Sequence, residues 1–166
     1  TTAVRHDDGK QDTNPSQATA VDASKGYYTT PALDDLDTDA LAGVEDFTVG
    51  RKGYGSIRWL GFTDVRHLPV ADLVDIVDNE VGVYCGEWES RKPPVGTALN
   101  KAAEVTLCGV WPGDRGVDSG PPKLPLTPAA LQQQEKELRQ YCKAQGAKFV
   151  SYDGTSGTWV FQVPHF

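Results

Sequence analysis

The sequence predicts an α+β domain in which a mainly antiparallel sheet of about six strands is sandwiched by two or three helices. Short segments rich in β-branched and aromatic residues recur between turns, and one long segment has a clear helical start and stop. The chain contains 17 Gly and 11 Pro in 166 residues, which favours short elements over a bundle of long helices. Its 39% hydrophobic content is enough for a single core.

The predicted strands are apolar or alternating segments bounded by turn residues. They cover residues 47–49, 57–60, 81–84, 103–108, 148–152 and 158–163. The last two flank Asp-Gly-Thr-Ser-Gly at 153–157, which predicts a hairpin.

Three segments have helical signals. Thr30 and Pro31 are typical of an N-cap and a first helical turn, and they predict a short acidic helix over 30–41. A second helix is predicted over 69–77, where Val and Leu recur at helical spacing. The third runs from Thr127 to the stop at Gly146. Residues 112–125 are predicted to form an exposed loop.

The first part of the chain is predicted to be separate from the domain. Residues 1–25 are polar and offer few side chains to bury, so we expect a disordered linker from an upstream repeat region. The folded domain is predicted over residues 26–166. No apolar run approaches the ~18 residues of a spanning helix, and no signal-peptide core is found, so we expect a nuclear or cytosolic protein without membrane contact.

Charge and cysteine content restrict the function classes. The net charge is −7, from 16 basic and 23 acidic residues, which disfavours direct binding of nucleic acid. The three cysteines are far apart and predict buried small side chains in a reducing compartment, not a disulfide framework. The three histidines lack metal-ligand spacing, and no phosphate-binding loop is found, so no metal or cofactor is predicted.

The last strand runs directly into Pro-His-Phe at 164–166. By pattern alone, His165 is more typical of an ordinary edge-strand histidine than of a catalytic one. An aromatic last residue directly after a histidine also suggests an end made by a cut or by truncation.

Several ordered blocks of the chain resemble the nucleoporin autopeptidase family, the self-cleaving C-terminal domain of Gly-Leu-Phe-Gly repeat nucleoporins and their fungal counterparts. The resemblance extends over roughly residues 27–166. The blocks are 47–57, 92–96, 99–107, 109–112, 146–150, 157–161 and 163–166.

The resemblance implies one self-cleavage in cis. Precursors of this family carry His-Phe-Ser or His-Phe-Thr and are cut after Phe by an N-to-O acyl shift. On this basis His165 is the expected base, Phe166 the scissile residue, and Asn100 the expected oxyanion stabiliser. The chain is then the inert N-terminal product of a serine/threonine-type autopeptidase.

The resemblance also implies a lasting role at the nuclear pore complex of the nuclear envelope. The domain is expected to anchor a phenylalanine-glycine repeat segment for protein transport and mRNA export. Expected partners are a β-propeller nucleoporin of the cytoplasmic side and the N-terminal peptide of the released fragment. Candidate partner-binding residues are Arg51, Lys52, Lys92 and Pro93.

Two alternatives stay open. One is a peptide-binding scaffold domain that never cleaves, and it is distinguished by the residue that follows Phe166 in the precursor. The other is a ribonucleoprotein-binding module, which the acidic charge disfavours.

Overall fold

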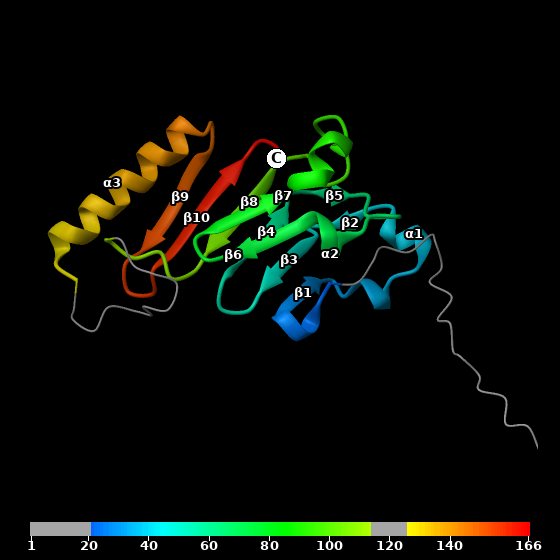
Figure 1. The fold of residues 1–166 in the computed structure, drawn as a ribbon, viewed down its shortest axis with the longest axis horizontal. Helices are drawn as coiled ribbons and strands as arrows, with labels where there is room; N and C mark the ends of the chain where they lie inside the picture. The colour runs from blue at the N-terminus through cyan, green and yellow to red at the C-terminus, as the bar shows by residue number, and fades with distance from the viewer. Residues whose placement is uncertain (1–20, 114–125) are drawn as a thin grey trace, which may run out of the picture.

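The computed structural model describes residues 21–113 and 126–166 (Figure 1). Six strands form one sheet in the order β1-β3-β4-β8-β10-β9, and every neighbouring pair is antiparallel. The predicted α+β class is therefore confirmed. Most of the predicted linker, residues 1–20, and most of the predicted loop, residues 114–125, lie outside the described residues. The strands are β1 (Tyr27–Thr30), β3 (Thr48–Arg51), β4 (Gly55–Trp59), β8 (Ala103–Leu107), β9 (Lys148–Asp153) and β10 (Thr158–Val163).

One face of this sheet forms the core. In β4 and β8 every second side chain is buried, and Ile57 of β4 lies opposite Val105 of β8. Two further sheets have two strands each: β2 (Val44–Glu45) pairs with β5 (Phe62–Thr63), and β6 (Val74–Val77) forms a hairpin with β7 (Glu80–Val83). Ile76 of β6 is fully buried in the same apolar cluster as Ile57. The β6–β7 hairpin thus covers the apolar face of the sheet.

The long predicted helix is confirmed as α3 (Pro128–Ala144), which lies beside β9 at one end of the sheet (Figure 1). The Thr127 hydroxyl caps it by accepting a 3.1 Å hydrogen bond from the N–H of Ala130. Leu138 and Cys142 are its buried side chains. No helix among residues 21–113 and 126–166 has the length and apolar content to cross a membrane.

The remaining helical elements are a turn or two long. They are the α-helices α1 (Thr38–Leu41) and α2 (Val70–Leu73) and the 3-10 helices η1 (Ala23–Lys25), η2 (Leu33–Asp35) and η3 (Gly86–Arg91).

The predicted helix over 30–41 is wrong. Thr30 belongs to β1, a strand that the sequence did not reveal, and it pairs with Thr48 of β3. Only η2 and α1 are helical in this segment, and α1 is capped by Asp37, whose carboxylate accepts a 2.8 Å hydrogen bond from the N–H of Ala40. Pairing with β3 gives Thr30 backbone partners that a local Thr-Pro signal cannot reveal.

The predicted helix over 69–77 is half wrong. Only its first turn forms α2, and Val74–Val77 is the strand β6. Val74 and Ile76 are buried while Asp75 and Val77 are exposed, which is the two-residue period of a strand. Val70, Leu73, Val74 and Val77 fit the helical spacing, but the pairing of Val74–Val77 with β7 makes the second half of the segment a strand.

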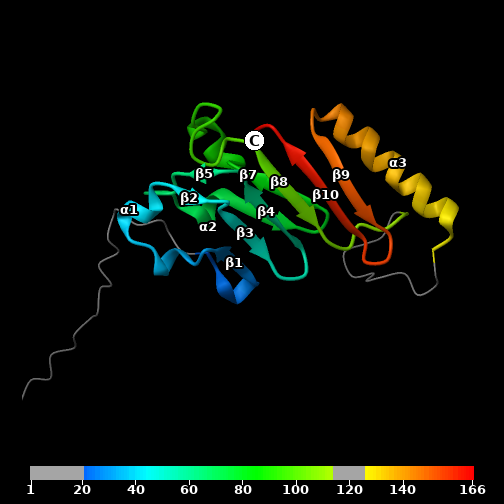
Figure 2. The same cartoon turned by 180° about the vertical axis from the view of Figure 1, so that it is seen from behind.

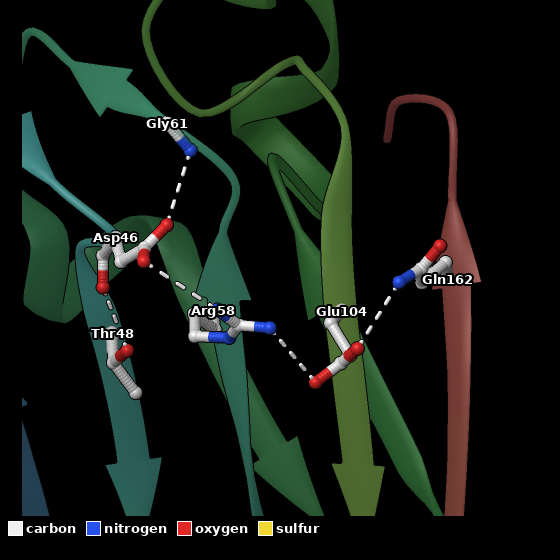
Figure 3. A network of polar contacts seen from close by, with 6 residues as sticks. All are labelled: Asp46, Thr48, Arg58, Gly61, Glu104 and Gln162. Atoms are coloured by element: carbon white, nitrogen blue, oxygen red, sulfur yellow. Dashed lines mark hydrogen bonds and ion pairs between the residues drawn. The ribbon is translucent and has the colours of Figure 1, made fainter. Parts of the chain in front are cut away.

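The opposite face of the sheet carries a chain of polar contacts (Figure 3). Asp46 accepts a 3.1 Å hydrogen bond from the N–H of Gly61 and forms a 3.5 Å ion pair with Arg58. Arg58 donates a 3.1 Å hydrogen bond to Glu104, and the other carboxylate oxygen of Glu104 accepts one of 3.1 Å from Gln162. These side chains connect β4, β8 and β10 across the sheet, close to the point where β10 ends.

Candidate active site

The last residues after β10 turn toward a loop that follows η3. Figures 1 and 2 show this end of the chain from opposite sides, marked C, close to the green η3 segment. The loop, residues 92–100, is closed by the N–H of Gly96, which donates a 2.7 Å hydrogen bond to the carbonyl of Asn100, and by the N–H of Asn100, which donates one of 3.0 Å to Thr97. Gly96 has a φ of 93°, which favours glycine. The Asn100 side chain is only 3% exposed.

Both polar atoms of this side chain are used. Its Nδ2 donates a 2.8 Å hydrogen bond to the Pro93 carbonyl, and its Oδ1 accepts a 3.1 Å hydrogen bond from the N–H of Phe166. The amide donor expected at the Phe166 carbonyl therefore binds Pro93 instead. The role of Asn100 as oxyanion stabiliser stays a prediction, and its observed contact with Phe166 is through the backbone nitrogen.

Phe166 is held at its ring as well as at its backbone. The ring lies 5.9 Å from that of the buried Trp59, centroid to centroid, and Trp59 stacks on Phe47 at 5.8 Å. The Phe166 carbonyl oxygen accepts a 3.3 Å hydrogen bond from the ammonium group of Lys92. A cation beside this oxygen can stabilise negative charge that develops there. Lys92 was predicted as a partner-binding residue, and the structure brings it to the predicted cleavage position.

His165 is exposed and lies next to the same oxygen. Its Nδ1 is 3.3 Å from the Phe166 carbonyl oxygen. The imidazole is therefore within reach of groups that react at this carbonyl, as an acid or base requires.

The other two predicted partner-binding residues lie away from Phe166. Arg51, at the end of β3, donates hydrogen bonds of 3.0 Å to the Lys25 carbonyl and 2.9 Å to the Ile76 carbonyl, and it stacks 4.0 Å from the Tyr54 ring centroid. Its guanidinium thus connects parts of the fold. Lys52 follows it and is exposed. Their role in partner binding stays a prediction.

A groove of about 720 Å³ begins at His165 and Phe166. Trp159, Phe161 and Val163, on the apolar face of β10, lie in it, and α3 and the β6–β7 hairpin line its sides. The exposed α3 residue Tyr141 is 55% accessible and contacts the Trp159 ring edge-on. An apolar groove of this kind fits a peptide with apolar side chains. No local sequence pattern indicates this groove, because its walls are far apart along the chain.

The described residues contain no group of three His, Cys, Asp or Glu side chains that could hold a metal ion.

Comparison with known proteins identifies the family. The family model Nucleoporin2, Nup98-96 autopeptidase S59, matches residues 24–166. The chain is 40% identical over 146 residues to Arabidopsis thaliana nuclear pore complex protein NUP98A and 37% identical over 147 residues to Drosophila melanogaster Nup98-Nup96. These matches cover 84% and 85% of the chain but only 13% and 7% of the relatives, so the chain spans a small part of their length.

Solved structures give the same result. The Chaetomium thermophilum Nup145N APD T994A mutant fused to Nup145C N matches with a TM-score of 0.70 and 29% identity over 84% of this chain and 94% of that chain. A chain of the yeast heterotrimeric Nup82-Nup159-Nup116 nucleoporin complex matches with a TM-score of 0.68 and 28% identity, over 85% of this chain and 97% of that chain. The chain therefore belongs to the Nup98-96 autopeptidase family of nuclear pore complex nucleoporins.

Proposed function

We propose that this domain cleaves its own precursor once, in cis, after Phe166. The observation that carries the proposal is the set of three contacts on one residue. Asn100 holds the Phe166 N–H, Lys92 lies 3.3 Å from the Phe166 carbonyl oxygen, and His165 lies 3.3 Å from the same oxygen. A fixed backbone, a cation and an imidazole around one carbonyl are the groups that acyl transfer requires.

The chemistry begins with a Ser or Thr that follows Phe166 in the precursor. Its hydroxyl oxygen attacks the Phe166 carbonyl carbon while His165 accepts the hydroxyl proton. The C–N bond then breaks, and the nitrogen takes a proton and leaves as an amine. The resulting ester is hydrolysed by water, which restores the hydroxyl and leaves a carboxylate on Phe166. Lys92 stabilises the oxyanion in both additions, in the role that was expected of Asn100.

After cleavage the domain acts by binding. We infer that it anchors an upstream phenylalanine-glycine repeat segment to the pore, and that the N-terminal peptide of the released fragment stays in the groove beside Phe166. The apolar lining of the groove supports an extended peptide with apolar side chains. The match to the Nup82-Nup159-Nup116 nucleoporin complex supports contacts with other nucleoporins. A β-propeller nucleoporin stays the expected partner among them.

Intact mass spectrometry tests the cleavage. The domain is expressed with Ser and several further residues after Phe166, beside a copy in which that added Ser is Ala and a copy with His165→Ala. We expect the first to be converted to a product that ends at Phe166, and both variants to stay full length.

Three other outcomes have separate meanings. If all three proteins stay intact, self-cleavage is refuted and the non-cleaving scaffold domain is the better description. If only the added-Ala copy stays intact, cleavage occurs but His165 is not its base. If the added-Ala copy is also cut, the added hydroxyl is not the nucleophile.

A further inference from the structure

Tyr84 is a buried tyrosine close to the site that the proposed chemistry does not use. It follows β7 directly, is 5% exposed, and its N–H donates a 3.0 Å hydrogen bond to the carbonyl of Leu73. Its φ is 57°, in the left-handed region that bulky residues rarely adopt. Such a conformation persists where the surrounding contacts determine it, and it is found most often at functional sites.

The hydroxyl of Tyr84 contacts the Ala98–Leu99 peptide, directly before Asn100. The N–H of Leu99 donates a 3.3 Å hydrogen bond to this hydroxyl, and the carbonyl of Leu99 accepts a 2.9 Å hydrogen bond from Nε1 of Trp59. Leu99 is fully buried, and Ala98 before it also has a left-handed φ, of 47°. The backbone that enters Asn100 is therefore held from two sides by aromatic side chains.

Asn100 is the next residue, and it holds the N–H of Phe166 through Oδ1. We propose that Tyr84 is a positioning residue for the cleavage, because its hydroxyl fixes the Leu99 peptide and so sets where the Asn100 amide meets Phe166. The inference rests on the proposed self-cleavage. Tyr84 touches neither the scissile carbonyl nor its attacking group, and it acts only through Asn100.

A second tyrosine provides a matched control. The hydroxyl of Tyr27, in β1, accepts a 3.0 Å hydrogen bond from the N–H of Ile76 and donates one of 3.2 Å to its carbonyl. It is the same group with the same kind of backbone partner, but β1 is the edge strand at the other end of the sheet from β10 and β9. Tyr27→Phe removes two hydrogen bonds and Tyr84→Phe removes one, so Tyr27→Phe is expected to lower stability at least as much.

The test is a double-mutant cycle of cleavage rates, measured on the precursor that carries Ser after Phe166. We expect Tyr84→Phe to slow cleavage roughly ten-fold and Tyr27→Phe to leave the rate within about two-fold, although both lower the melting temperature. In an Asn100→Ala background, Tyr84→Phe is expected to change the rate by less than about two-fold, since Tyr84 acts through Asn100. An equal loss in both backgrounds, or a wild-type rate for Tyr84→Phe, overturns the inference.

An NMR measurement on the product domain tests the same step without catalysis. The side-chain amide signals of Asn100, assigned by their loss in Asn100→Ala, should shift in Tyr84→Phe and stay unchanged in Tyr27→Phe. Unchanged Asn100 amide signals in Tyr84→Phe overturn the inference. This readout applies even if Asn100→Ala abolishes cleavage and the rates in that background cannot be compared. If the unsubstituted precursor does not cleave, the proposed function itself has failed, and this outcome is distinct from a wild-type rate in Tyr84→Phe.

Discussion

The Oδ1 atom of Asn100 lies 3.1 Å from the backbone nitrogen of Phe166, although 66 residues separate them along the chain. The same side chain binds Pro93 through its nitrogen. One buried amide therefore joins the 92–100 loop to the residue at which we propose cleavage. An ionised carboxylate cannot make both contacts, because it has no donor for the Pro93 carbonyl.

Asn100→Ala is expected to destabilise the product domain by about 2 kcal/mol, because the Pro93 carbonyl and the Phe166 N–H lose their partner in a largely buried place. Urea unfolding measures the change. Gln140→Ala removes an exposed amide from α3 and should change the free energy of unfolding by less than about 0.5 kcal/mol. Equal stabilities for the two variants would contradict the structural role of Asn100.

Lys92→Met is expected to slow cleavage of the precursor about a hundred-fold, because the ammonium group 3.3 Å from the Phe166 carbonyl oxygen is lost. The thermal stability should barely change, since this lysine is exposed. Time courses by mass spectrometry give the rates. Lys101→Met is the matched control, because the Lys101 ammonium group also binds a backbone carbonyl, that of Phe62, at 2.6 Å. A rate loss shared by both lysine variants would show that the effect is not specific to Phe166.

Tyr141→Ala is expected to weaken binding of the released fragment's N-terminal peptide about ten-fold, since Tyr141 is an exposed aromatic residue in the wall of the groove. Fluorescence anisotropy with a labelled peptide measures the affinity. Phe62→Ala removes a side chain that is 69% exposed and does not line this groove, so it should leave the affinity unchanged. Peptide binding that responds to Phe62 and not to Tyr141 would indicate another docking surface.

Stability is expected to fall at alkaline pH through two tyrosines. Burial raises the pKa of Tyr84 and of Tyr152 above the ordinary value of 10.0. As the pH rises above that value, the unfolded chain releases these protons while the folded domain keeps them, so the free energy of unfolding decreases. The stability advantage of the wild type over Tyr84→Phe, from urea unfolding at increasing pH, should therefore shrink. An advantage that stays constant through the tyrosine range would contradict the raised pKa.

The elements that the sequence predicted well are those with local signals at both ends. Thr127 and Gly146 bracket α3, and the turn at 153–157 joins the two strands of the hairpin β9–β10. The helix over 30–41 failed because strand pairing between Thr30 and Thr48 outweighed a local cap signal. The helix predicted at Val74–Val77 is a strand, because Val74 and Val77 fit the spacing of a helix while Val74 and Ile76 fit that of a strand.

The site was predictable only in part. His165 and Phe166 came from the resemblance of the last block, and the structure brings Asn100 to them. The contact between Lys92 and Phe166 joins residues 74 positions apart, so no local pattern indicates it. The direction of the hydrogen bond between Asn100 and Phe166 could not be predicted either, because sequence does not show which of the two amide atoms contacts which neighbour.

The polar chain on the outer face of the sheet gives the last prediction (Figure 3). Glu104 is 23% exposed and accepts hydrogen bonds from Arg58 and Gln162 with separate oxygens. Glu104→Gln replaces one acceptor by a donor and removes the charge, so one of the two partners loses its bond. We expect a loss of about 1–2 kcal/mol in the free energy of unfolding.

Glu137→Gln is the matched control for this change. The Glu137 carboxylate also accepts a hydrogen bond from a glutamine, Gln133 at 2.8 Å, but both side chains are exposed on α3. This variant should lose less than about 0.5 kcal/mol, because water replaces an exposed partner. Hydrogen exchange should then be faster at the end of β10 in Glu104→Gln alone, since Gln162 is the second-last residue of that strand. Equal losses in the two variants would mean that the chain of contacts across β4, β8 and β10 adds nothing to the stability of the sheet.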